Sequence, residues 1–134
     1  MERKNKFLIT LASIIIIGIF VLINNMPLNK ETIPSKFVAG ENPGFDLTPG
    51  RLNFGKIIPG SSGSRNILVE NELDKPIKIV IKSSGDISGY MIVSKNNFIL
   101  QPNESENLVF SVFLKEDTKY GEYNGQIEII SKKT

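Results

Sequence analysis

Acidic side chains gather at two places in the chain, and they are the first candidates for chemistry. Glu70, Glu72 and Asp74 alternate in a stretch rich in turn formers, and Asp117 directly follows Glu116. Neither group has the D-x-D-x-D-G spacing of a calcium loop, and carboxylates in turns are usually solvated. The chain has no histidine and no cysteine, so the usual base of a hydrolase and the softer metal ligands are missing. The sequence therefore predicts no enzymatic activity, no metal and no cofactor.

One modification motif is present. Asn103, Glu104 and Ser105 satisfy the N-x-S pattern of a glycan acceptor, and they fall in a predicted surface corner. The same pattern also arises by chance in a chain rich in asparagine. Asn103 is therefore a candidate glycosylation site.

An uncharged, apolar run from Phe7 to Ile23 determines how the rest of the chain is placed. As a helix it covers roughly 25 Å, and continued through Met26 it reaches about the 30 Å of a hydrocarbon core. A cleaved secretory signal is the alternative, since it also has a basic start and an apolar centre. The residues that follow, INNMPLNK, contain no small-x-small peptidase site. We therefore expect an uncleaved signal-anchor that contacts the lipid bilayer through Phe7–Ile23.

The charges that flank this run predict its orientation. Arg3, Lys4 and Lys6 precede it against a single Glu2, and the first basic residue after it is Lys30. The positive-inside rule places the N-terminus in the cytoplasm and the remainder outside the cell membrane. These head residues account for the whole net charge of +2, so the remainder is neutral overall, and we expect it to have no electrostatic footprint for nucleic acid or for an anionic surface.

The chain divides by composition into four parts. Residues 24–44 contain prolines and glycines without a sustained period, which is typical of a linker. The expected parts are a basic cytoplasmic head at 1–6, a transmembrane signal-anchor helix at 7–26, a linker at 27–44 and a β domain at 45–134.

From Phe45 onward, apolar and polar residues alternate with a period of two. Strands are predicted at 45–48, 51–55, 64–71, 77–82, 90–94, 97–100, 106–114 and 121–131. Their intervals of roughly 8–15 residues are typical of an antiparallel sandwich of immunoglobulin type. The predicted fold class is therefore all-β: an immunoglobulin-like antiparallel β-sandwich preceded by one transmembrane helix. Its apolar faces place these residues in the core: Phe54, Ile67, Ile79, Phe110, Val112, Tyr123 and Ile127.

Three segments carry a family resemblance: FDLTPGRLNFGKIIPGSSGSRNILVENELDKPIKI, LQPNESENLVFSVFL and GEYNGQIEI. They resemble Ig-like domains related to major sperm protein and to Hydin-type repeats, and also the Ig-like modules attached to bacterial and archaeal surface glycosidases. The resemblance covers about residues 45–131, and its motifs are structural turns. It implies a binding, spacer or scaffolding module, because members of this broad group are generally not catalysts.

Four apolar residues fall on the strand face opposite to the core set. Val80, Val109, Phe113 and Ile130 form an apolar strip on an outer face if their strands are neighbours. A contiguous strip of this kind usually marks a contact site. The alternative is that the four are scattered or covered by a loop.

The last predicted strand is a second candidate interface. In the domains that this chain resembles, a further strand pairs with the one matching GEYNGQIEII, but only SKKT follows Ile130. We therefore expect an open edge along Tyr123, Ile127 and Ile129 that a partner strand completes. Alternatively, the strand at 51–55 covers this edge, or Lys132 and Lys133 guard it.

The expected function is a membrane-anchored extracytoplasmic Ig-like interaction or scaffolding module that binds another envelope or membrane protein. An alternative is a filament accessory subunit resembling pilin-like or archaellum-stator proteins, although Lys6-Phe7 lacks the glycine of a prepilin processing site. A carbohydrate-binding or hydrolytic module is a third hypothesis. That hypothesis needs exposed aromatic platforms, and the chain has no Trp and three Tyr.

Overall fold

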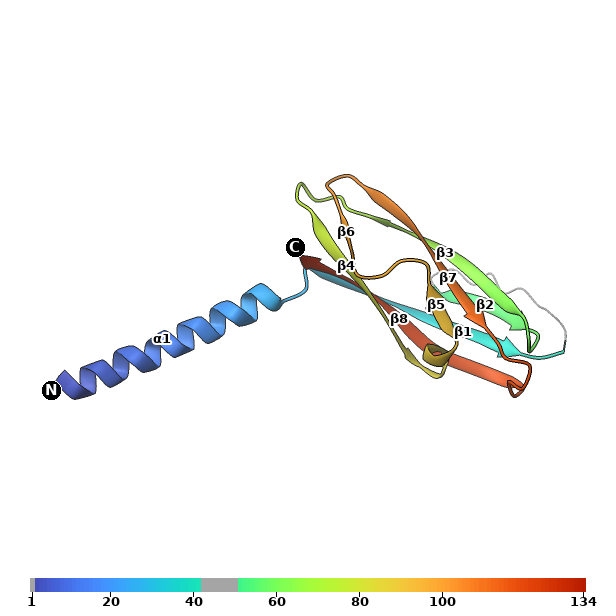
Figure 1. Cartoon of the computed structure of the whole chain (residues 1–134), viewed down its shortest axis with the longest axis horizontal. Coiled ribbons are helices and arrows are strands. Elements are labelled where there is room, and N and C mark those ends of the chain that lie inside the picture. The colour runs from blue at the N-terminus through green and yellow to red at the C-terminus, as the bar shows by residue number, and fades with distance from the viewer. Residues whose placement is uncertain (1, 42–50) are drawn as a thin grey trace.

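The computed structural model describes residues 2–41 and 51–134, and a long helix projects from its β domain (Figure 1). Helix α1, Glu2–Asn25, begins before the apolar run, so the basic residues form its first turns. The hydroxyls of Thr10 and Ser13 donate hydrogen bonds of 2.9 Å to the carbonyls of Lys6 and Ile9, which satisfies them within an apolar helix. No residue of α1 is buried. Of the described segments, α1 alone is long and apolar enough to cross a membrane.

The described strands form two sheets. They are β1 Asn29–Ala39, β2 Leu52–Ile57, β3 Ser62–Glu70, β4 Ile77–Gly85, β5 Met91–Val93, β6 Phe98–Leu100, β7 Ser105–Phe113 and β8 Gly121–Lys133, with the 3-10 turn η1, Asp86–Gly89, between β4 and β5. Sheet A has the order β2-β1-β8-β4-β6, and sheet B has the order β3-β7-β5. The predicted strands at 51–55, 64–71, 77–82, 90–94, 97–100, 106–114 and 121–131 correspond to β2 through β8, and the prediction at 45–48 lies outside the described residues.

Apolar side chains of both sheets share one core, an arrangement consistent with a β-sandwich. Sheet B contributes Leu108, Phe110 and Val112 from alternate positions of β7. The predicted burial is confirmed for Phe54, Ile79, Phe110, Val112 and Ile127, whereas Ile67 and Tyr123 are half-buried against the core.

The predicted linker at 27–44 is wrong, because most of it is strand β1. β1 pairs with β8 along its whole length and with β2 from Ser35 onward. Pro34 is tolerated because β1 has a neighbour on one side only at this position. Phe37 and Ala39 point into the core and are buried. Only Met26, Pro27 and Leu28 therefore separate the helix from the domain.

The expected open edge along Tyr123, Ile127 and Ile129 is also wrong. β8 lies in the middle of sheet A, paired antiparallel with β1 on one side and with β4 on the other. The segment that was assigned to the linker supplies the missing strand. Strand 51–55, which we considered for that edge, instead pairs with β1 as part of β2.

The pairing of β1 with β2 departs from the antiparallel expectation. Among the described residues it is the one parallel pair. β1 lies between β2 and β8 and runs antiparallel to β8. Sheet A is therefore mixed, which the alternation of residues within each strand does not encode.

A side chain closes part of the edge of β4. β6 pairs with β4 only from Ile77 to Ile79. Beyond it, the amide of Ile81 donates to Oδ1 of Asn96 at 2.7 Å, and Nδ2 of Asn96 donates to the carbonyl of Ile81 at 3.0 Å. The Asn96 amide thus occupies the position of a neighbouring strand and covers the edge.

Asn71 joins two turns at the end of the domain that lies near the helix (Figure 1). Its side-chain nitrogen donates to the carbonyls of Lys75, Leu100 and Gln101 at 2.9–3.1 Å, and its side-chain oxygen accepts from the amide of Leu73 at 3.1 Å. Asn71 is 1% exposed. One buried side chain therefore holds the β3–β4 turn against the β6–β7 turn.

Candidate functional site

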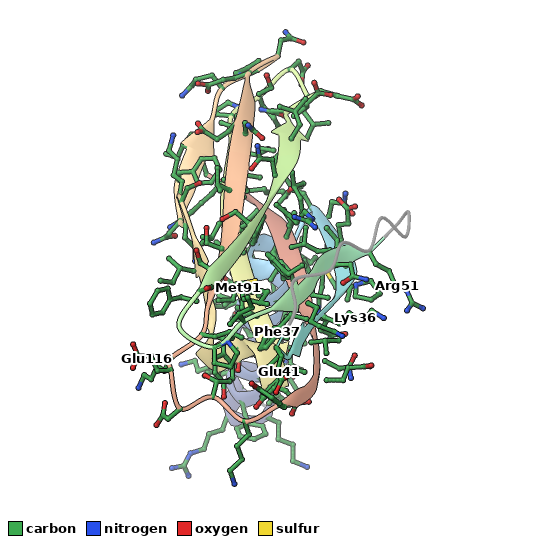
Figure 2. The ribbon with its side chains drawn as sticks, turned by 90° about the vertical axis from the view of Figure 1, so that its right-hand side faces the viewer. Lys36, Phe37, Glu41, Arg51, Met91 and Glu116 are labelled. Carbon is green, nitrogen blue, oxygen red and sulfur yellow. The ribbon has the colours of Figure 1, made fainter. Side chains whose placement is uncertain are left out.

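A hollow of about 640 Å³ lies at the end of the domain away from the helix. It lies between the η1–β5 segment, the end of β7 and the loop that leads into β8. Figure 2 views this end, with Phe37 and Met91 inside the body and Glu116 on the outside of the β7–β8 loop. The lining residues are Gly89, Tyr90, Met91, Ile92, Phe113, Lys115, Asp117, Thr118, Lys119 and Tyr123.

Tyr90 and Tyr123 line the hollow, and their rings pack against the buried Phe37. Phe37 stacks on Tyr123 with ring centroids 4.7 Å apart, and Tyr90 meets both rings edge-on at 5.5 and 5.2 Å. The Tyr123 hydroxyl donates to the carbonyl of Lys119 at 2.9 Å, which ties β8 to the preceding loop. Burial, followed by the hydrogen bond with Tyr90, raises the pKa of Tyr123 above its ordinary value of 10.0. Tyr123 is therefore a neutral structural group near pH 7.

The rim of the hollow carries mixed charge. Lys115, Asp117 and Lys119 are exposed on the β7–β8 loop. Among residues 2–41 and 51–134, no three residues of the types His, Cys, Asp and Glu lie close enough together to hold a metal ion. The acidic cluster around Glu70 lies at the other end of the domain, on the β3–β4 turn. The hollow thus offers aromatic and apolar surface with polar groups at its rim, which is the composition of a binding site.

An exposed apolar surface on sheet B continues from the hollow. Ile92 lies opposite Ser111, so on the outer face it falls between Val109 and Phe113. Leu68 is diagonal to Val109 on the neighbouring strand β3. Leu68, Ile92 and Phe113 are 59%, 67% and 55% exposed, and Val109 is half-buried. We call Leu68, Ile92, Val109 and Phe113 the sheet B patch.

The structure separates the predicted apolar strip into two parts. Val109 and Phe113 lie on the outer face of sheet B, whereas Val80 and Ile130 are direct register partners in sheet A. Ile130 is 6% exposed. The four residues therefore do not form one strip, because β4 and β8 belong to a different sheet from β7.

Sequence reasoning missed Leu68 and Ile92 as members of an exposed surface. The signal for Leu68 was present, since it occupies the opposite face from Ile67 and Val69. Ile92 lies in a strand of three residues, which is too short for its alternation to assign a face. Only the pairing of β5 with β7 brings Ile92 beside Phe113.

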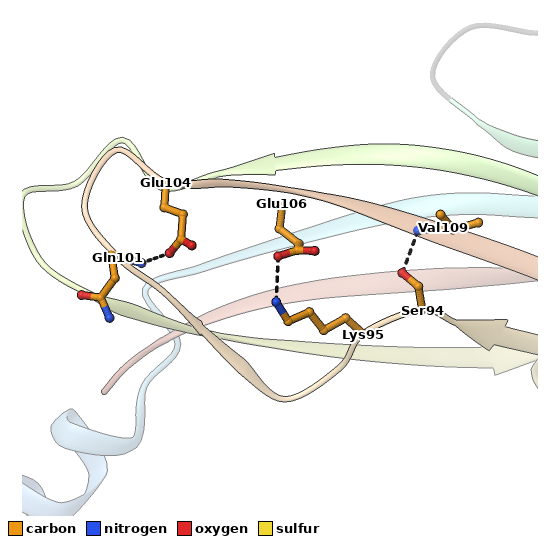
Figure 3. Close-up of polar contacts among 6 residues, drawn as sticks. All are labelled: Ser94, Lys95, Gln101, Glu104, Glu106 and Val109. Carbon is orange, nitrogen blue, oxygen red and sulfur yellow. Dashed lines mark hydrogen bonds and ion pairs between the residues drawn. The ribbon is translucent and has the colours of Figure 1, made fainter.

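Polar contacts order the segment between β5 and β7, as Figure 3 shows. The amide of Val109 donates to the Ser94 hydroxyl at 3.0 Å, and Lys95 forms an ion pair of 2.7 Å with Glu106. The amide of Gln101 donates to Oε2 of Glu104 at 2.7 Å. The contact between Gln101 and Glu104 lies within the turn that carries the glycosylation motif.

Asn103 lies on this turn, and its side chain is exposed. Its backbone has φ 60°, and its amide donates to the carbonyl of Asn71 at 2.9 Å, so the turn uses the backbone and leaves the side chain accessible. We expect native protein to carry a glycan at Asn103. Mass spectrometry of protein from its own cells should show added mass that Asn103→Gln removes. The control is Asn107→Gln, an exposed asparagine outside any N-x-S motif, which should leave the mass addition in place. An unmodified intact mass would contradict the assignment.

Comparison of the chain with protein-family models, with curated proteins and with solved structures finds no match in any of the three.

Proposed function

We propose that the chain is a single-pass, membrane-anchored Ig-like β-sandwich that binds another envelope or membrane protein and carries out no catalysis. Its N-terminus lies in the cytoplasm, and its domain lies outside the membrane. The observation that carries the proposal is the sheet B patch, which runs into the hollow at the end of the domain away from the helix. Contiguous exposed apolar surface bordered by polar groups is characteristic of contact sites.

The arrangement of helix and domain supports the anchored state. α1 has no buried residue, although almost all of its central side chains are apolar, so it needs an apolar surrounding. The domain core consists of residues from Phe37 onward, and the helix contributes none of it. The helix therefore positions the domain and does not contribute to the packing of its core.

The Ig-like assignment is supported by the two sheets that share one core and by the resemblance of residues 45–131. The absence of catalysis is supported by the sequence, which has no histidine or cysteine. The polar groups at the rim of the hollow, Lys115, Asp117 and Lys119, suit orientation of a bound segment.

The role of the sheet B patch can be tested by substituting two exposed isoleucines, one inside the patch and one outside it. Ile92 lies in the patch and is 67% exposed, whereas Ile99 lies on β6 at an edge of sheet A and is 53% exposed. We expect Ile92→Lys to weaken binding of the partner about thirtyfold, because a buried apolar anchor contributes about 2 kcal/mol or more to an interface. Ile99→Lys should leave binding unchanged.

The measurement is affinity purification of the full-length chain in mild detergent, followed by a binding titration with the recovered partner. Unfolding midpoints of both variants check that the domain is intact. Equal binding by wild type and Ile92→Lys would contradict the assignment of the patch. Recovery of filaments made only of this chain would instead favour the pilin-like or archaellum-stator-like alternative.

A further inference from the structure

The end of the domain beside the helix lies within reach of the lipid headgroups. Only Met26, Pro27 and Leu28 connect α1 to β1, and this connection spans at most about 10 Å. The amide of Leu28 also donates to the carbonyl of Ser131 at 2.7 Å, which fixes the end of β8 beside the helix (Figure 1). A headgroup layer is about 5–8 Å thick. The last residues of β8 therefore lie in this layer or directly above it if α1 spans the bilayer.

Three lysines lie at this end of sheet A, and none of them forms an ion pair with a described carboxylate. Lys132 lies directly opposite Lys78 in the β4–β8 ladder, and Lys133 follows at the next position, on the opposite face of β8. Like charges directly opposite each other in a ladder are destabilising. Among the described residues no carboxylate lies within ion-pair distance of these three lysines, whereas the nearby Lys30 forms an ion pair of 2.7 Å with Glu128. An anion from outside the chain would offset this repulsion.

Three acidic groups of the same end lie on its other side. Glu70, Glu72 and Glu104 line a hollow of about 240 Å³ on the β3–β4 and β6–β7 turns. These turns lie farther from the helix than the end of β8 does (Figure 1). These carboxylates lie away from the bilayer. On the helix side, Glu128 is paired with Lys30, and Glu31 is exposed on β1.

We propose that Lys78, Lys132 and Lys133 bind the phosphate groups of anionic phospholipids. The proposal rests on the membrane anchor of the proposed function and deepens it. A basic cluster beside a membrane helix is attracted to an anionic surface. Binding on the lysine side alone tilts the domain, so that the end of sheet A faces the bilayer and the carboxylates of the β3–β4 and β6–β7 turns face away. The lysines therefore determine the direction in which the sheet B patch is presented.

The experiment uses the full chain in lipid nanodiscs. Because the chain has no cysteine, Thr134→Cys gives a single site for a fluorophore. Quenching by spin-labelled headgroups then reports the distance between the end of β8 and the lipid. We expect stronger quenching in discs that contain phosphatidylglycerol than in discs of phosphatidylcholine alone, and loss of that difference in the double variant Lys78→Gln, Lys132→Gln.

A charge-matched variant serves as the control. Lys115→Gln with Lys119→Gln removes the same charge from the other end of the domain, and it should keep the difference between the two kinds of disc. Inorganic phosphate at the concentration of the lipid phosphates should not remove the stronger quenching in discs that contain phosphatidylglycerol, because the proposed ligand is the lipid headgroup. If it does, and an equal concentration of chloride does not, the lysines bind free phosphate and the lipid proposal is wrong.

Two failures are distinguishable. A chain that does not co-elute with nanodiscs lacks a membrane anchor, and this outcome refutes both the proposed function and the lysine proposal. A chain that co-elutes but is quenched equally in both kinds of disc, or whose quenching is unaffected by the double variant, refutes the lysine proposal alone.

Discussion

Replacement of Phe110 by alanine is expected to lower the free energy of unfolding by about 3–5 kcal/mol. Phe110 is 1% exposed and lies in the middle of β7, between its ladder partners Arg65 and Val93. It also lines a cavity of about 150 Å³ between the two sheets. Removal of the ring enlarges an existing void, and the surrounding residues cannot close it without moving both sheets.

Phe113 provides the matched control for this prediction. It lies in the same strand as Phe110, but it faces outward and is 55% exposed. Phe113→Ala should therefore cost less than about 1 kcal/mol. Urea unfolding of the full chain in mild detergent, followed by circular dichroism of the β domain, measures both variants. Equal losses for the two substitutions would show that the assigned faces of β7 are wrong.

Replacement of Asn71 by alanine is expected to lower the free energy of unfolding by about 2–3 kcal/mol, since it removes four hydrogen bonds made by a side chain that is 1% exposed. The side-chain nitrogen of Asn71 donates hydrogen bonds to the carbonyls of Lys75, Leu100 and Gln101. Its side-chain oxygen accepts one from the amide of Leu73. The carbonyl of Gln101 also accepts from the backbone amide of Glu104 at 3.1 Å, so it keeps one partner in the variant. The β3–β4 and β6–β7 turns should therefore separate.

The position of the loss identifies the mechanism. Amide hydrogen exchange of Asn71→Ala should increase first at Leu73 and at the turn around Asn103, whose amide is bonded to the carbonyl of Asn71. Asn71→Asp should be at least as destabilising, because it turns a carboxylate toward three carbonyl oxygens. Asn107→Ala, an exposed asparagine of β7, should leave the unfolding midpoint unchanged. Stability that is the same in Asn71→Ala and in wild type would contradict the assigned role.

The parts of the fold that follow from alternation were predictable from the sequence. β4 shows this, because Ile77, Ile79 and Ile81 alternate with Lys78, Val80 and Lys82 and are buried as expected. β1 was not predictable in this way. Its first half is polar and contains Pro34, and only pairing with β8 over its whole length makes it a strand. The composition of this segment therefore predicted a linker, whereas pairing with β8 and β2 makes it a strand of sheet A.

The candidate site shows the same division. The outward position of Val109 and Phe113 follows from the period of β7. Their separation from Val80 and Ile130 does not, since period-two patterns state which face a residue occupies but not which sheet its strand joins. The aromatic cluster beside the hollow includes Phe37, which lies in β1, a strand that the sequence did not predict. The hollow could therefore not be predicted from the sequence, although Tyr90 and Tyr123, which line it, were assigned to predicted strands.

The central position of β8 has a consequence for the order in which the domain folds. β1 and β4 are both paired with β8 and not with each other, so sheet A cannot form until residues 121–133 have been synthesised. β1 leaves the ribosome first and must wait for a strand that lies far away in the chain. Contacts of such sequence separation slow folding into the range of milliseconds to seconds. During that interval the earlier strands have unpaired edges, and we expect the nascent domain to bind a chaperone.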